Sequence, residues 1–94
     1  MDSSQQRGRV AEAMCIAYLT QLGWDVFVGF GNTQADLVAV RNGTCVRVEV
    51  KAYGHDRSVP DVYPDRFDAL LCVTPSYGVI EETGRYKSTG PVFS

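Results

Sequence analysis

The stretch that decides the fold is Asp36–Lys51, which reads DLVAVRNGTCVRVEVK. Apolar residues alternate with others on both sides of Asn42-Gly43, and two such runs joined by this dipeptide are typical of a β-hairpin. Asn-Gly favours a two-residue type I′ turn because both central residues need positive φ angles. The sequence therefore predicts two antiparallel strands, over residues 35–40 and 44–51.

The two-residue turn also predicts which side chains oppose each other. Counting back from Arg41 opposite Thr44 places Asp36 opposite Glu49, and Lys51 lies two residues farther along the same face. A shift of one residue would move Asp36 to the other face. That other face is entirely apolar and is the predicted core face: Leu37, Ala39, Val46, Val48 and Val50.

Two directly opposed carboxylates repel each other and destabilise a sheet. A divalent cation is one reason for a fold to keep such a pair, because Mg2+ prefers oxygen ligands, among them carboxylates. Lys51 beside the ion could orient an attacking water or help deprotonate it. The alternative interpretation is a solvated face on which Lys51 neutralises Asp36 and Glu49.

A helix is predicted over residues 4–21, with Ser3 and Gln6 forming a capping box and Gly23 ending the helix. The helix is apolar around most of its circumference, but Glu12 falls within an apolar flank. Buried carboxylates need partners. Glu12 is therefore either a site residue near the hairpin acids or a side chain that reaches solvent at the helix edge.

The remaining sequence completes one small α/β domain spanning residues 1–94, with about four to five strands. A polar, proline-containing loop with at most one helical turn is predicted over 52–66. The predicted further strands are 24–30, a buried strand at 67–74, and short edge segments at 79–82 and 85–87.

Composition narrows the function classes. The chain has 94 residues, of which 45% are hydrophobic and 21% charged, so it is a globular domain and not a disordered one. A net charge of −2 argues against a generic basic coat protein for nucleic acid. We see no secretory signal and no apolar run long enough to span a bilayer, so we expect a cytoplasmic protein with no membrane partner.

Cysteine and histidine are too sparse for two other kinds of site. The cysteines are Cys15, Cys45 and Cys72, without a C-x-x-C pair, and His55 is the sole histidine. This argues against a structural zinc site. A Ser-His-Asp or Cys-His enzyme would depend entirely on His55, which lies in a predicted polar turn.

Four residues in order resemble the PD-(D/E)XK nuclease superfamily, in particular its small Holliday-junction-resolvase-like and phage-type members. They are Glu12 in GRVAEAMCIAYLTQLGWDV, Asp36 in QADLVAV, and Glu49 and Lys51 in the E-x-K tripeptide. The resemblance implies a restriction-endonuclease-like minimal core, a helix on a mixed sheet with a central hairpin. Two features depart from the family pattern. Ala35 replaces a common proline, and loop 52–66 replaces a second helix, leaving one sheet face poorly covered.

The resemblance also implies roles. Asp36 and Glu49 would bind Mg2+, with Mn2+ able to substitute and the Val50 carbonyl as a further ligand. Lys51 would position or activate the water that attacks a phosphodiester. Glu12 would hold a second metal or a metal-bound water, and Gln34 is an auxiliary polar candidate.

Basic residues near these positions are candidate DNA contacts. Arg7 and Arg9 begin the predicted helix, Arg47 shares the face of the acids, and Arg57 follows Lys51 in the loop. Each could equally be a solvated surface charge. Tyr53 could stack on a base or cover the sheet.

The function that the resemblance implies is a Mg2+-dependent DNA endonuclease, either specific for branched or junction DNA or a nicking enzyme, without a small-molecule cofactor. The alternatives are a non-catalytic nucleic-acid-binding or assembly subunit that retains the nuclease fold, and a structural oligomer with an incidental acidic face. A homodimer or larger homo-oligomer is predicted, because one helix covers one face of a sheet whereas strand 67–74 is typical of burial on both faces.

Overall fold

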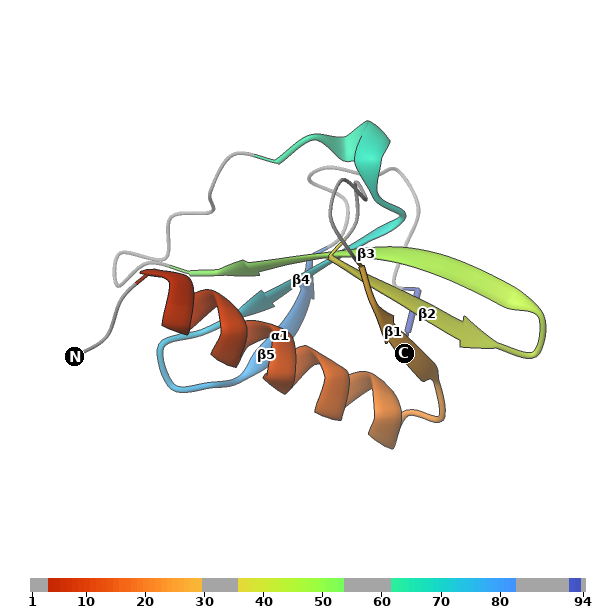
Figure 1. Ribbon diagram of the computed structural model, residues 1–94, viewed down its shortest axis with the longest axis horizontal. Coiled ribbons are helices and arrows are strands. Elements are labelled where there is room, and N and C mark those ends of the chain that lie inside the picture. Colours follow the sequence, from red (N-terminus) through yellow and green to blue (C-terminus); the bar gives the residue numbers. More distant parts are fainter. Residues whose placement is uncertain (1–3, 30–35, 54–61, 83–91, 94) are drawn as a thin grey trace.

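The computed structural model describes residues 4–29, 36–53, 62–82 and 92–93. The elements follow in the order α1 (Ser4–Gln21), β1 (Asp25–Val28), β2 (Leu37–Arg41), β3 (Thr44–Ala52), the 3-10 helix η1 (Pro64–Arg66), β4 (Ala69–Val73) and β5 (Val79–Glu82). The strands form one sheet in the order β1-β2-β3-β4-β5, with β3 and β4 parallel and the other neighbours antiparallel (Figure 1). The predicted helix on a mixed sheet is confirmed.

Several predicted features lie outside the described residues: Ser3, Gln34, Ala35, His55, Arg57 and the segment 85–87. In the part of the chain that the structure describes, neither helix combines the length and the apolar character that a membrane crossing requires.

Helix α1 ends as its sequence predicts. Gly23 has a φ of 91°, a left-handed conformation that a β-carbon would strain. Its N–H donates to the Thr20 carbonyl at 3.0 Å, and the Trp24 N–H donates to the Leu19 carbonyl at 3.1 Å. These are the paired hydrogen bonds of a Schellman motif. The motif turns the chain directly into β1 and buries Leu19 and Trp24 in the same core.

The hairpin has the predicted turn and register. Asn42 and Gly43 have φ angles of 52° and 81°, as a type I′ turn requires. Arg41 pairs with Thr44, and the ladder continues in step to Leu37 opposite Val48. The alternation of the sequence therefore sets which residues of β2 and β3 face the core.

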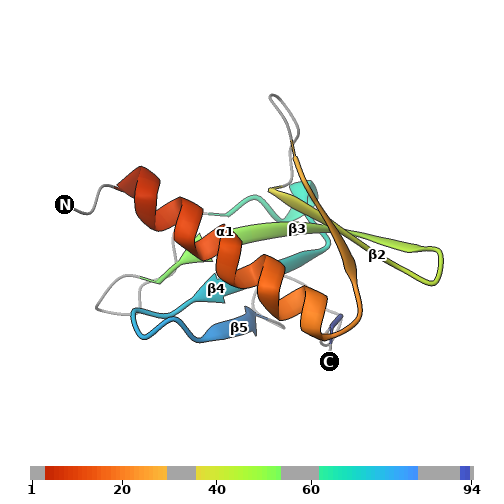
Figure 2. The same cartoon turned by 60° about the horizontal axis from the view of Figure 1, so that its bottom comes forward.

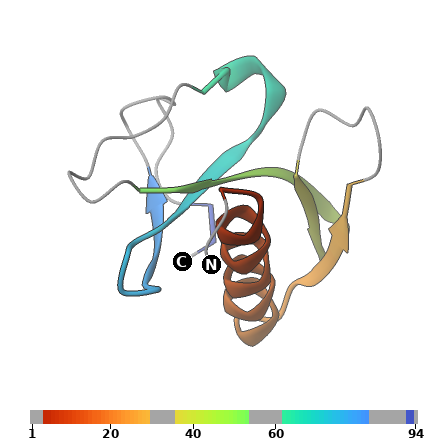
Figure 3. The ribbon, with the colours of Figure 1, turned by 60° about the vertical axis from the view of Figure 1, so that its left-hand side comes forward.

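The main core lies between α1 and one face of the sheet (Figures 2 and 3). The helix contributes Ala11, Cys15 and Leu19, which recur every four residues on one side. Each buried leucine contributes about 1.5–3 kcal/mol of hydrophobic free energy. The sheet contributes Leu37, Ala39, Val46, Val48, Val50, Ala69, Leu71 and Val73.

A second, smaller cluster covers the opposite face of β4. Phe67, Leu70 and Cys72 are buried there, with Tyr53 and Val62 packed against them. Figure 3 shows α1 on one side of the sheet and η1 on the other. The expectation of a poorly covered face is therefore wrong for β4, because the two ends of the loop and Phe67 supply the cover within one chain.

The core is closed by a residue near the end of the chain, where the sequence makes no firm prediction. Phe93 is buried and meets the Trp24 ring edge-on, with centroids 5.2 Å apart. The backbone N–H groups of Val92 and Phe93 both donate to the Glu81 carboxylate on β5. A carboxylate on an edge strand thus holds this segment against the core.

Candidate active site

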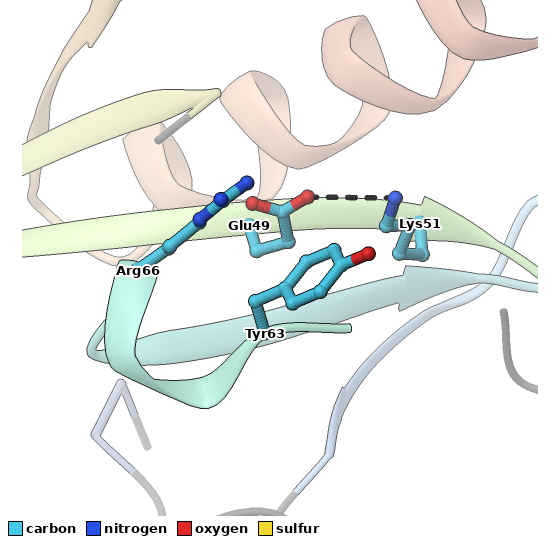
Figure 4. A pocket seen from close by; sticks show the side chains of 4 residues that line it. All are labelled: Glu49, Lys51, Tyr63 and Arg66. Atoms are coloured by element: carbon cyan, nitrogen blue, oxygen red, sulfur yellow. Dashed lines mark ion pairs between the residues drawn. The ribbon is translucent and has the colours of Figure 1, made fainter. Parts of the chain in front are cut away.

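Glu49 and Lys51 project from β3 on the face away from α1. Their neighbour Val50 is buried against the helix, and side chains alternate along a strand. Parallel pairing sets them beside Leu70 and Cys72 of β4. The Glu49 side chain is 17% exposed and the Lys51 side chain 32%, with Nζ 3.5 Å from Oε1 (Figure 4). Strand β3 therefore holds an acid and a cation together in a partly buried place.

Asp36, immediately before β2, is held against β3 next to Glu49. Its backbone N–H donates to the Val48 carbonyl at 3.1 Å, and its Oδ2 accepts the Val50 N–H at 2.9 Å. A side-chain carboxylate here receives a backbone N–H that a strand ladder would otherwise satisfy with a carbonyl. This hydrogen bond uses one carboxylate oxygen, and the other can bind a cation.

The surroundings of Glu49 disfavour its charge. Burial raises the pKa of Glu49 above its ordinary value, and the Asp36 charge raises it further, while Lys51 and Arg66 act in the opposite direction. The repulsion predicted from the hairpin register is therefore present. A bound cation would relieve it.

Glu12 on α1 belongs to the same electrostatic neighbourhood. It is half-buried, next to the buried Ala11. Burial raises its pKa, the Asp36 charge raises it further, and Arg9 lowers it. Asp36 thus acts on acids from two other elements, α1 and β3, which supports the prediction that Glu12 lies near the hairpin acids.

Two carboxylates of this site could bind a cation, but the described residues do not supply a complete coordination shell. Within the described ranges, no three His, Cys, Asp or Glu side chains converge closely enough to hold a metal ion. Mg2+ is commonly held by one or two carboxylates, with water and substrate oxygens completing its shell. Asp36 and Glu49 have this donor chemistry, provided that Glu49 turns from Lys51 toward Asp36.

Beside Glu49 lies a pocket of about 160 Å³, lined by Glu49, Lys51, Tyr63 and Arg66 (Figure 4). Tyr63 is 60% exposed, and the Arg66 guanidinium carbon lies 4.6 Å from the centre of its ring. Tyr63 and Arg66 were not predicted as site residues from the sequence. The available signal was an aromatic and a basic residue within a polar loop, which does not by itself indicate proximity to Glu49.

The candidate DNA-binding arginines differ in their surroundings. Arg7 and Arg9 are exposed at the beginning of α1. Arg47 shares the sheet face of Glu49, but its Nε and Nη2 bind the Asp68 carboxylate at 3.2 and 3.1 Å, and its backbone N–H also donates to Asp68. Tyr53 packs against the second cluster, so it covers the sheet.

The two buried cysteines add no nucleophile to this site. Burial raises the pKa of Cys15 to about 12 and that of Cys72 to about 11. Both thiols therefore stay protonated at neutral pH, and the thiolate is the reactive form.

Comparisons with known proteins extend the fold assignment. No family model matches this chain, and no curated protein matches it. Among solved structures, the bacterial homing endonuclease I-Ssp6803I is similar, with a TM-score of 0.69 and 24% sequence identity over 86% of this chain and 67% of that chain. At this identity the likeness establishes the fold alone. The chain therefore folds like an endonuclease of known structure.

Proposed function

We propose that this protein is a Mg2+-dependent DNA endonuclease of the PD-(D/E)XK type. The observation that carries the proposal is the position of Asp36 against β3, where its charge acts on Glu49 of β3 and on Glu12 of α1, with Lys51 beside Glu49. Half-buried acids whose pKa is raised by a neighbouring carboxylate, as Asp36 does to Glu12 and Glu49, bring no benefit to a purely structural domain. The fold shared with a homing endonuclease adds support.

In this proposal Asp36 and Glu49 bind Mg2+, with the Val50 carbonyl as a further ligand, and Mn2+ takes the same place. A bound ion of this kind stabilises the charge that develops on a phosphate during hydrolysis. Lys51 orients the water for in-line attack on the phosphorus or helps to deprotonate it. Glu12 holds a second cation or an ordered water beside Asp36.

The proposed substrate is branched or junction DNA, or a duplex that is nicked. Sequence-specific readout needs elements that enter the major groove, and the helices among the described residues are α1, which packs on the sheet, and the three-residue η1. The proposed working unit is a homodimer of single-domain subunits, which would present two sites to two strands.

Cleavage of labelled linear, nicked, flapped and four-way DNA with Mg2+, Mn2+ or EDTA tests the proposal. We expect cutting with either metal and none in EDTA. Asp36→Asn should lower the rate at least about 100-fold, since a metal supplies several kcal/mol of transition-state stabilisation. Asp25→Asn, a matched change at an exposed acid on β1, should not. Equal rates for Asp36→Asn and the parent would refute the assignment.

The Glu49–Lys51 ion pair favours a second candidate, a non-catalytic subunit that binds nucleic acid. In this pair Lys51 already neutralises Glu49 without a metal. Tight DNA binding in Ca2+, with no cleavage of any of the four substrates in Mg2+ or Mn2+, would identify this function instead.

A further inference from the structure

The pocket beside Glu49 has the composition of an anion site. Two cations, Lys51 and Arg66, flank one carboxylate, and the Tyr63 ring forms a wall (Figure 4). At about 160 Å³ it is smaller than the roughly 300–1,000 Å³ of pockets that enclose drug-sized ligands. It can therefore accept a charged group of a larger molecule but not a whole nucleotide.

Arg66 is held in place from two directions. Its guanidinium lies over the Tyr63 ring, 4.6 Å from the centroid, and its backbone N–H donates to the Tyr63 carbonyl at 2.9 Å. The next residue, Phe67, is fully buried in the second cluster and anchors the end of η1. An arginine held this way loses less conformational freedom on binding an anion than a mobile one.

Two other arginines of the hairpin are already engaged. Arg47 forks onto Asp68, and Arg41 lies 4.4 Å from the centre of the Trp24 ring and donates to a backbone carbonyl. In the described part of the chain, Arg66 forms no ion pair within 4.0 Å. Its five donors remain available for the bidentate geometry in which arginine binds phosphate.

We propose that Arg66 binds a phosphate of the DNA backbone in this pocket and that Tyr63 is the positioning residue that holds the Arg66 guanidinium there. The proposal rests on DNA as the substrate of the neighbouring acids. Glu49 lies between Arg66 and Lys51 in the pocket (Figure 4). A phosphate bound by Arg66 would therefore lie next to the acids of the candidate site.

The test is the affinity for a short labelled duplex in Ca2+, measured by fluorescence anisotropy at several salt concentrations. Arg66→Gln should weaken binding at least about tenfold and reduce the salt slope by about 1, as loss of one phosphate contact predicts. Arg66→Lys should keep the salt slope but recover only part of the affinity. Arg41→Gln, which removes the same charge at the far end of the hairpin, should change neither.

Substitutions of Tyr63 test whether this residue positions the Arg66 guanidinium or contacts DNA itself. Tyr63→Phe keeps the ring and should bind like the parent, whereas Tyr63→Ala should weaken binding about two- to fivefold through loss of the cation–π contact. Tyr77→Ala removes a tyrosine of the same 60% exposure and should have no effect. Circular dichroism melts identify any variant that fails to fold.

Parallel cleavage assays in Mg2+ distinguish the two proposals. If the parent cuts DNA and Arg66→Gln binds and cuts equally well, the phosphate site is wrong and the nuclease stands. If no protein cuts but Arg66→Gln alone loses affinity and salt slope, the phosphate site stands and the nuclease is wrong. Equal losses for Arg66→Gln and Arg41→Gln would reduce the effect to net charge and overturn the inference.

Discussion

At the scale of single residues, Asp36 has opposing effects on stability. Its carboxylate accepts the Val50 N–H at 2.9 Å, and its charge raises the pKa values of Glu49 and Glu12. Removing the whole side chain relieves the repulsion but also leaves a backbone N–H without its acceptor. The hairpin register alone predicts only the repulsion. Because the structure adds this hydrogen bond, Asp36→Asn, and not Asp36→Ala, is the substitution that removes the charge alone.

Asp36→Asn and Asp36→Ala should therefore differ. In EDTA, the asparagine variant keeps an acceptor for the Val50 N–H, loses the charge, and should melt at or above the parent temperature. The alanine variant should lose about 1 kcal/mol relative to it, roughly 4–8 °C in Tm for a domain of this size. Thermal unfolding followed by circular dichroism measures both, and identical melting curves would show that the hydrogen bond contributes nothing.

Glu49 should make stability depend on pH. Burial and the Asp36 charge raise its folded pKa above the ordinary 4.5, so the folded protein binds this proton more tightly than the unfolded chain does. The resulting stabilisation is fully present below pH 4.5 and is lost as the pH rises through the folded pKa. Glu49→Gln cannot ionise, so without metal its Tm advantage over the parent should grow from about pH 4 to pH 7.

The control for this series is Glu82→Gln, which removes an acid from β5 and not from the candidate site. Mg2+ should reduce the Glu49→Gln advantage, because a cation that binds the ionised carboxylate stabilises the parent alone. A Tm difference that stays constant across the pH range would contradict the cause given for the raised pKa of Glu49.

At the scale of elements, alanine substitutions at Gly8, within α1, and at Gly23, just after α1, should change stability in opposite directions. A β-carbon at Gly8 would meet no atom within 4 Å, so Gly8→Ala should stabilise the helix by roughly 0.5–1 kcal/mol. Gly23 has a φ of 91°, and there alanine should cost about 1–2 kcal/mol. Urea unfolding provides both values, and an unchanged stability of Gly23→Ala would argue against the Schellman ending.

Another link between elements joins β3 to the segment before β4. Asp68 accepts the Arg47 N–H and its guanidinium, and the Asp68 N–H donates to the Arg47 carbonyl at 2.8 Å. The two residues are 21 positions apart, beyond the range of any helix or hairpin periodicity. The predicted role of Arg47 in binding DNA came from its sheet face alone, which could not reveal this partner.

At the scale of the whole molecule, the reason to expect a dimer changes. The second face of β4 is covered by the chain itself. The remaining candidate is β1, a strand at the edge of the sheet on which Phe27 is 59% exposed and Val28 46%. An edge strand presents unpaired backbone groups and can pair with another chain. The proposed partner at β1 is a second copy, related by two-fold symmetry.

Sedimentation at micromolar protein tests this arrangement. The parent should have twice the 10.3 kDa chain mass, and Phe27→Lys should shift it toward the monomer, since charge on an edge strand opposes pairing. Ile80→Lys, a matched change on the opposite edge strand β5, should leave the mass unchanged. A parent mass near 10.3 kDa at every concentration would rule out the dimer.

The sequence by itself determined the features that depend on neighbours along the chain. The bounds of α1, the turn at Asn42-Gly43 and the pairing of β2 with β3 all follow from local conformational preference and alternation. Because the hairpin register is local, the proximity of Asp36 to Glu49 could be predicted as well. Half of the candidate site was therefore predictable from sixteen consecutive residues.

Only the tertiary structure decided what lies across from that hairpin. The cover over β4, the Arg47–Asp68 fork and the place of Tyr63 and Arg66 beside Glu49 all bring residues within or just after loop 52–66 against β3 or β4. A polar loop of this kind has no periodicity to set its path. The place of its described end, residues 62–66, follows instead from burial of Phe67 and from parallel pairing of β4 with β3, which are non-local contacts that appear only when the whole chain packs.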